Sequence, residues 1–60
     1  MKAYFTPDEL AEYLAISKAT VYRLVNKRQL PFNKVGGMLR FRKDDIERYL
    51  EAGRIEPIKL

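Results

Sequence analysis

The stretch that decides the fold runs Ser17-Lys18-Ala19-Thr20-Val21-Tyr22-Arg23-Leu24-Val25-Asn26. Val21, Leu24 and Val25 stand at positions i, i+3 and i+4, which places them on one face of a helix. Ser17 is a good N-cap, because its side chain can accept a hydrogen bond from a free backbone N–H. The opposite face is small, aromatic, cationic and amide in character and comprises Ala19, Tyr22, Arg23 and Asn26. The pattern predicts a helix with an aliphatic side for the core and a polar outer side.

An earlier helix is predicted to begin after Thr6 and to stop near residue 14 or 15. Thr6 and Glu9 have the spacing of a capping box, and Pro7 suits the first helical position. Tyr4 and Phe5, just upstream, are interpreted as a hydrophobic staple. The residues expected to face the core are Leu10, Ala11 and Leu14. Two short helices joined by a tight turn, the second polar on its outer face, describe a helix-turn-helix.

A β-hairpin is predicted downstream, because Pro31 cannot continue the second helix. Residues 32–35 and 38–41 are short runs of strand-like composition that flank Gly36-Gly37. A glycine pair between such runs favours a two-residue hairpin turn, which needs positive φ. Opposed residues share a face of a hairpin. The set with more apolar bulk, which is expected to face the core, is Phe32, Lys34, Leu39 and Phe41.

The last helix is predicted to begin at Lys43 or Asp44 and to end at Gly53. Asp44 and Glu47 have the spacing of a capping box, so these acids, with Asp45, are interpreted as helix-capping residues rather than metal ligands. The apolar stripe of this last helix is predicted to comprise Ile46, Tyr49 and Leu50.

The predicted fold is mainly α with a small β-hairpin, a winged helix-turn-helix of three helices plus a two-stranded wing. We expect residues 1–53 to form this domain and residues 54–60 to form a C-terminal tail without a periodic pattern. Three interpretations of the tail's apolar side chains stay open: they dock on the core, meet a partner, or belong to a frayed end. These side chains are Ile55, Ile58 and Leu60.

Charge is segregated along the chain, whose net charge is +4. Residues 1–16 carry one basic and three acidic side chains, and residues 44–60 carry three basic and five acidic ones. Residues 17–43 carry eight basic side chains and no acid. Such segregation favours one face built for a polyanion over a merely solvated basic surface.

The residue inventory argues against catalysis. The chain has no cysteine and no histidine, so thiolate metal sites and the commonest general base are missing. We expect no enzyme activity, no cofactor and no metal. No apolar run approaches the roughly 20 residues that span a bilayer, and the N-terminus lacks the apolar stretch of a signal peptide. A cytoplasmic protein, nucleoid-associated when bound to DNA, is expected, with no membrane partner.

The outer face of the second helix suits the DNA major groove, which accepts one helix. Arg23 can pair with guanine, Asn26 with adenine, and Ala19 can touch a thymine methyl group. The hairpin is expected to lie along the backbone or to enter the minor groove. Gly37 serves either the turn alone or a close approach to DNA as well. The full set of predicted DNA-binding residues is Ser17, Lys18, Ala19, Thr20, Tyr22, Arg23, Asn26, Lys27, Lys34, Gly37, Arg40 and Arg42.

These motifs, in this order and spacing, resemble the excisionase-type, MerR-like winged helix-turn-helix family over about residues 4–51. The resemblance rests on residues 6–14, on residues 16–25, on Leu30-Pro31, on residues 34–46 and on Tyr49-Leu50. It implies a compact winged-helix fold with the second helix in the major groove and the hairpin as the wing. It also implies wing contacts at Arg40 and contacts from the helix at Ser17, Lys18, Ala19, Tyr22 and Arg23.

The expected function is sequence-specific binding of double-stranded DNA by an excisionase-like or transcriptional regulatory protein. MerR proteins proper carry an effector-binding part and a long dimerisation helix. The 60 residues of this sequence show neither feature, so effector sensing by them is not expected. Further copies of the chain on adjacent sites, and an integrase, are the expected protein partners. The alternative is a winged-helix module for protein–protein interaction in a phage or recombination complex.

Overall fold

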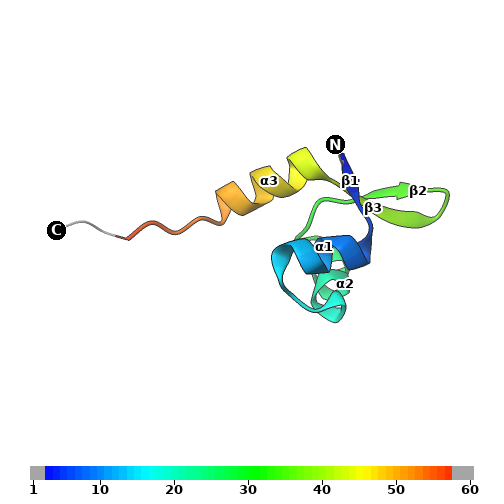
Figure 1. Cartoon of the computed structure of the whole chain (residues 1–60), viewed down its shortest axis with the longest axis horizontal. Coiled ribbons are helices and arrows are strands. Elements are labelled where there is room, and N and C mark those ends of the chain that lie inside the picture. The colour runs from blue at the N-terminus through cyan, green and yellow to red at the C-terminus, as the bar shows by residue number, and fades with distance from the viewer. Residues whose placement is uncertain (1–2, 58–60) are drawn as a thin grey trace.

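The computed structural model describes residues 3–57 and contains three helices and three short strands (Figure 1). The expected combination of three helices with an antiparallel hairpin is confirmed. In chain order the elements are β1 (Tyr4–Phe5), α1 (Pro7–Leu14), α2 (Lys18–Asn26), β2 (Asn33–Val35), β3 (Met38–Arg42) and α3 (Lys43–Ala52).

Helix α1 begins as its sequence predicts. The Thr6 Oγ1 accepts from the Glu9 N–H at 3.2 Å, and a Glu9 carboxylate oxygen accepts from the Thr6 N–H at 2.9 Å. This capping box satisfies two backbone donors at the helix start. The helix ends at Ala15, which has a φ of 56° in the left-handed region. The Ile16 N–H then donates to the Ala11 carbonyl at 3.0 Å, which closes the tight turn before α2.

Helix α2 is capped by Ser17, whose Oγ accepts from the Thr20 N–H at 3.1 Å. Its C-terminal end forms a Schellman motif around Arg28, which has a φ of 58°. The Arg28 N–H donates to the Val25 carbonyl at 3.0 Å, and the Gln29 N–H donates to the Leu24 carbonyl at 2.9 Å. This reversal sends the chain back to the core at Leu30, which is buried.

The hairpin of β2 and β3 has the predicted turn, and three of the four residues predicted to face the core do so, whereas the prediction for Lys34 is wrong. Lys34 pairs with Leu39 and Val35 with Met38, leaving Gly36 and Gly37 as a two-residue turn. Their φ values of 58° and 83° are the positive values that a type I′ hairpin turn requires. On the core-facing side Phe41 is fully buried and Phe32 and Leu39 pack against the core, whereas Lys34 is exposed.

Strand β1 is not predicted by the sequence. Tyr4 pairs with Arg42 and Phe5 with Phe41, so the sheet has the order β1-β3-β2 with β3 in the centre. The pairing brings Phe5 into the core, where its ring stacks on Tyr13 with a centroid separation of 4.8 Å. The two residues interpreted as a staple therefore also anchor the N-terminal segment to the sheet.

One apolar core joins the helix-turn-helix to the sheet and to the first turns of α3. The side chains buried in it are Phe5, Leu10, Ala11, Val21, Val25, Leu30, Phe41 and Ile46. Within residues 3–57 it contains no buried polar or charged side chain. Since this core is small, the orientation of α2 relative to the hairpin depends on few contacts.

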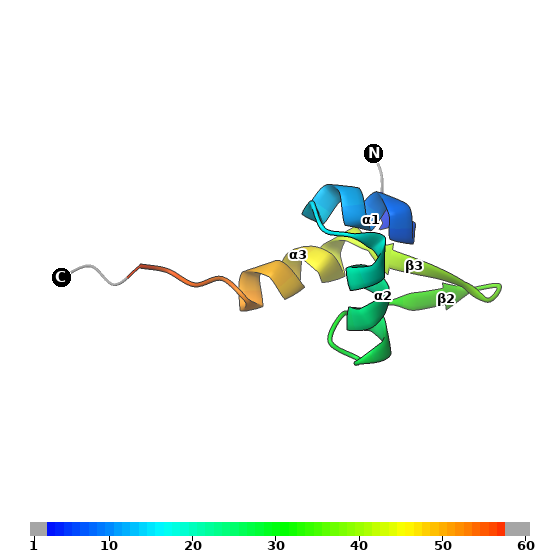
Figure 2. The same ribbon diagram turned by 90° about the horizontal axis from the view of Figure 1, so that it is seen from below.

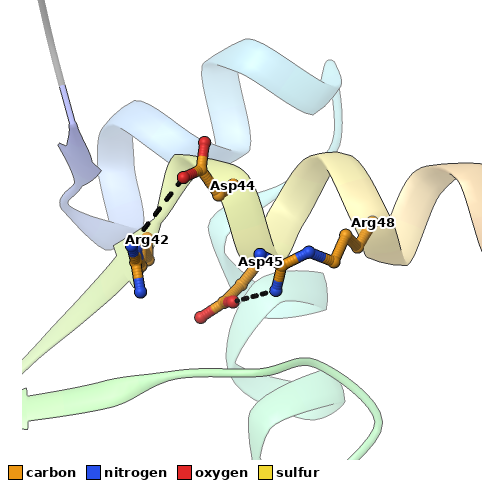
Figure 3. A network of polar contacts seen from close by, with 4 residues as sticks. All are labelled: Arg42, Asp44, Asp45 and Arg48. Carbon is orange, nitrogen blue, oxygen red and sulfur yellow. Dashed lines mark hydrogen bonds and ion pairs between the residues drawn. The ribbon is translucent and has the colours of Figure 1, made fainter.

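The start of α3 differs from the prediction of a capping box at Asp44 and Glu47. The N-cap is Arg42, the last residue of β3, and it makes no side-chain capping hydrogen bond. The strand runs directly into the helix, and the Lys43 N–H donates instead to the Ala3 carbonyl at 2.9 Å. Asp44 lies 3.8 Å from Arg42 in an ion pair, and Asp45 pairs with Arg48 at 3.2 Å (Figure 3). Among the described residues, no group of three potential ligands could hold a metal ion.

Helix α3 and the hairpin extend in opposite directions from the helix-turn-helix (Figures 1 and 2). Consequently only part of the predicted apolar stripe reaches the core: Ile46 is buried and Tyr49 packs against the core, but Leu50 is 42% exposed. The helix ends at Gly53, which has an ordinary negative φ of −92°.

The segment after α3, residues 54–57, has no regular structure. Ile55 is 92% exposed, so the interpretation that it docks on the core is wrong. Ile58 and Leu60 lie outside the described residues. Between residues 3 and 57 no helix is long and apolar enough to cross a membrane.

Candidate nucleic-acid interface

The outer face of α2 presents most of the predicted site residues to solvent. Val21 and Val25 fix the helix to the core, and this orientation exposes the side that lies opposite them. Thr20 is half-buried, and the others on this face are exposed: Ser17, Lys18, Ala19, Tyr22, Arg23, Asn26 and Lys27. The helix therefore offers small, aromatic, amide and cationic groups on one accessible surface.

A short chain of polar contacts orders the first turns of this face. The Ser17 Oγ lies 2.8 Å from the Thr20 Oγ1, and an Arg23 guanidinium nitrogen donates to the same Thr20 oxygen at 3.4 Å. Thr20 thus holds Arg23 along the helix surface and connects it to the cap. The Ser17 Oγ already serves as the helix cap, so any phosphate at this helix start would meet backbone N–H groups beside an occupied hydroxyl.

Lys18 is the cation at the start of α2. Its Nζ lies 3.1 Å from Asp8 and 5.9 Å from the centre of the Tyr22 ring. The hydrogen bond and charge of Asp8 raise the pKa of Lys18 above its ordinary value, which stabilises its ammonium form. Both side chains are largely exposed, and a surface pair of this kind contributes little to stability. Lys18 is therefore available to exchange Asp8 for a phosphate.

A groove of about 580 Å³ separates α2 from the hairpin. It brings Tyr22 and Asn26 of α2 together with the predicted wing residues Lys34, Gly37 and Arg40. Its remaining lining residues are Pro7, Val25, Arg28, Phe32, Met38 and Leu39, so no carboxylate lines it. Residues that the sequence places on two separate elements thus share one cationic surface.

Arg40 is held against its own strand within this groove. One guanidinium nitrogen donates to the Leu39 carbonyl at 2.6 Å, and the other lies 3.8 Å from the Met38 sulfur. These contacts leave its positive charge unpaired by any carboxylate within residues 3–57. No carboxylate within residues 3–57 pairs with four further cations, which are Arg23, Lys27, Arg28 and Lys34.

Seven of the twelve predicted residues do not line the groove: Ser17, Lys18, Ala19, Thr20, Arg23, Lys27 and Arg42. Lys27 is exposed at the C-terminal end of α2 and does not line it. Arg42 is the residue of β3 farthest from the hairpin turn, and it pairs with Asp44 at the start of α3 (Figure 3). Neither Lys27 nor Arg42 therefore contributes to the lining of the groove.

Arg28 and Phe32 are groove residues that the predicted set omits. The Arg28 guanidinium carbon lies 5.4 Å from the centre of the Phe32 ring, a cation–π distance. The sequence contains one signal for a role of Arg28, because this residue belongs to the acid-free segment and directly follows the predicted helix. The left-handed backbone that sends its side chain to the groove has no such signal.

Comparison with known proteins gives one family match and one relative. The model of the family described as "Helix-turn-helix domain" matches residues 4–54. Protein YvgK of Bacillus subtilis (strain 168), described as uncharacterized, is 40% identical over 45 residues. The matched region covers 75% of this chain but only 15% of that relative. No solved structure matches the chain significantly.

Proposed function

We propose, from the premise that this chain belongs to the helix-turn-helix domain family, that it binds double-stranded DNA in a sequence-specific manner. The observation that carries the proposal is the groove between α2 and the hairpin, whose lining includes three cations and no carboxylate. Recognition helices of this motif enter the major groove and read bases with their N-terminal residues. We therefore assign α2 to the major groove and the hairpin to the adjacent backbone or minor groove.

The proposed roles follow from position on α2 and the hairpin. Ala19, Tyr22 and Arg23 face outward in the first turns of α2, where base edges are read, and Asn26 extends this surface toward the hairpin. Gly37 lines the groove next to the hairpin tip, where an absent side chain permits close approach of a strand. The residues assigned to the phosphate backbone are Ser17, Lys18, Thr20, Lys27, Lys34, Arg40 and Arg42.

A paired substitution tests these assignments. Arg23→Ala combined with Arg40→Ala removes one cation from α2 and one from the wing, and neither side chain is buried. Loss of a bidentate base contact by Arg23 alone costs about 1–3 kcal/mol of discrimination, so specific binding should be abolished while the circular dichroism spectrum stays native. The control, Arg48→Ala with Arg54→Ala, removes the same charge from α3 and the following segment and should bind as wild type. Normal binding by the first variant would contradict the site.

For the biological role we propose either an excisionase-like protein or a transcriptional regulatory protein. Both roles require the same contacts with DNA. A single module of this size buries roughly 600–1,000 Å² on DNA, so several copies on adjacent sites, with an integrase as a further partner, would supply useful affinity. Analytical ultracentrifugation with one-site and multi-site duplexes tests the assembly. Cooperative assembly requires a higher affinity per site on the multi-site duplex, and identical affinities would count against it.

We propose residues 1–53 as the binding unit. Residues 54–57 are exposed. Their described polar contacts are the ion pairs of Arg54 with Glu51 and Glu56 at 3.9 and 3.3 Å and the hydrogen bond from the Arg54 N–H to the Glu51 carbonyl at 3.2 Å. A chain that ends at residue 53 should retain its stability within about 0.5 kcal/mol, because exposed surface changes rarely cost more. It should also retain the duplex affinity of the 60-residue chain. A large loss of either would place the tail inside the functional unit.

The exposed apolar side chains at the ends of the molecule favour a second candidate, a protein-interaction module. Met38 at the wing tip is 57% exposed, and Leu50 of α3 is 42% exposed. Binding through such surfaces depends little on salt, whereas binding to DNA weakens steeply as salt rises. Salt dependence therefore separates the two functions.

A further inference from the structure

The groove between α2 and the hairpin gathers cations from three segments of the chain. Arg28 comes from the turn after α2, Lys34 from β2 and Arg40 from β3. Like charges that share one groove repel each other, and no carboxylate lines the groove to offset them. Asn26 and Tyr22 add an amide and a phenol group, which are neutral hydrogen-bond donors. The arrangement is complementary to an anion with several oxygens.

Arg28 is fixed in this groove by its backbone and by Phe32. Its φ of 58° lies in the left-handed region, where the helix-ending residue is usually glycine. Two Schellman hydrogen bonds, from the N–H groups of Arg28 and Gln29, hold that conformation. The guanidinium carbon lies 5.4 Å from the centre of the Phe32 ring, and the guanidinium makes no hydrogen bond or ion pair within residues 3–57. A strained position occupied by an arginine over an aromatic ring points to a role for its side chain.

We propose that this groove binds the phosphodiester backbone of DNA and that Arg28 is an additional phosphate ligand within it. The inference rests on the proposed function and sharpens it. The C-terminal end of α2 lies beside the hairpin, so a backbone strand that borders the major groove passes between the two elements. Guanidinium groups form strong paired hydrogen bonds with phosphate oxygens. The hairpin then rests on the backbone rather than in the minor groove.

The test compares Arg28→Asn with wild type on a duplex selected by the wild-type protein. Asparagine tolerates the left-handed region, so the Schellman turn and the fold should persist while the cation is lost. Loss of a charged hydrogen bond should weaken binding at least about tenfold, and equally for matched and unrelated duplexes. The slope of log affinity against log salt should become shallower by about 0.9, the value for one phosphate contact.

Three comparisons make the result decisive. Arg48→Asn removes an exposed arginine of α3 outside the groove and should keep the wild-type salt slope. Arg28→Lys retains the charge and should recover most of the slope. A neutral methylphosphonate placed at the contacted phosphate should weaken wild-type binding but leave Arg28→Asn unaffected.

Three outcomes would overturn the inference, and they are distinguishable. If wild type binds duplex DNA with a steep salt dependence and Arg28→Asn matches it in affinity and slope, Arg28 is no phosphate ligand while the proposed function stands. If wild-type binding to any duplex is weak and insensitive to salt, the proposed function fails and the inference falls with it. A change of sequence preference in Arg28→Asn would assign Arg28 to base reading and also contradict the proposal.

Discussion

Two residues with left-handed backbone end the first two helices. Ala15 closes α1 with a φ of 56°, and Arg28 closes α2 with a φ of 58°. Both carry a Cβ, and residues with side chains adopt this conformation at a cost of about 1–2 kcal/mol. Neither position is glycine, so neither turn carries the usual sequence mark of a helix end. The angle between α1 and α2 thus depends on a conformation that the surrounding core must enforce.

Replacing Ala15 with glycine should stabilise the protein. Relief of the left-handed strain exceeds the entropy that glycine adds to the unfolded chain, about 0.4–1 kcal/mol, so we expect a net gain of about 0.5–1 kcal/mol. Urea denaturation measures this change. The matched control is Ala19→Gly, which lies inside α2 and should lose about 1 kcal/mol. If both substitutions destabilise equally, the turn geometry assigned to Ala15 is wrong.

At the scale of elements, the sequence predicts correctly those features that form by contacts between residues close together in the chain. The capping box of Thr6 and Glu9, the Ser17 cap and the glycine turn all join residues within four positions of one another, and all three form as expected. Strand β1 escapes prediction because its two residues are defined only by pairing with β3, far along the chain. The cap of α3 is predicted wrongly because the donor at Lys43 is satisfied by the Ala3 carbonyl.

The same distinction applies to the candidate site. The face of α2 follows from helical periodicity, and the sequence predicts the hairpin residues from their pairing. The groove, however, arises only when the hairpin packs beside α2, and this packing adds Arg28 and Phe32. The sequence predicts Leu50 in the core, but α3 extends away from the core beyond Tyr49, which leaves Leu50 exposed. The lining of the groove and the exposure of Leu50 are thus determined by how the elements pack, which the periodicity of the sequence does not reveal.

The hairpin turn offers a test at this scale. A Cβ added at Gly36 or Gly37 meets nothing within 4 Å, so any effect of substitution there arises from the backbone. Asparagine is favoured at the first position of a type I′ turn, and Gly36→Asn should leave stability unchanged. Gly37→Val should cost about 1–2 kcal/mol, because a β-branched residue strongly disfavours positive φ. Thermal unfolding of both variants checks this, and equal melting temperatures would contradict the turn assignment.

At the scale of the whole molecule, the segregation of charge along the sequence matches the arrangement of the elements in space. The acid-free segment from Ser17 to Lys43 spans α2, the groove and the hairpin, whereas the acidic side chains lie on α1, on α3 and in the segment after it. Figures 1 and 2 show α3 and the hairpin extending to opposite sides of the helix-turn-helix. One small core therefore holds a cationic helix and a cationic hairpin side by side, and all the acidic side chains lie on other parts of the chain.

The most direct test of DNA binding through this surface is the affinity for a duplex selected from a random pool, measured across a range of salt concentrations. Each phosphate neutralised contributes about 0.9 to the slope of log affinity against log salt. The contacts proposed for α2, the groove and the wing predict a linear plot with a steep negative slope, and a selected sequence that binds far more tightly than unrelated DNA. A pool without enrichment, together with an affinity that does not change with salt, would contradict the account.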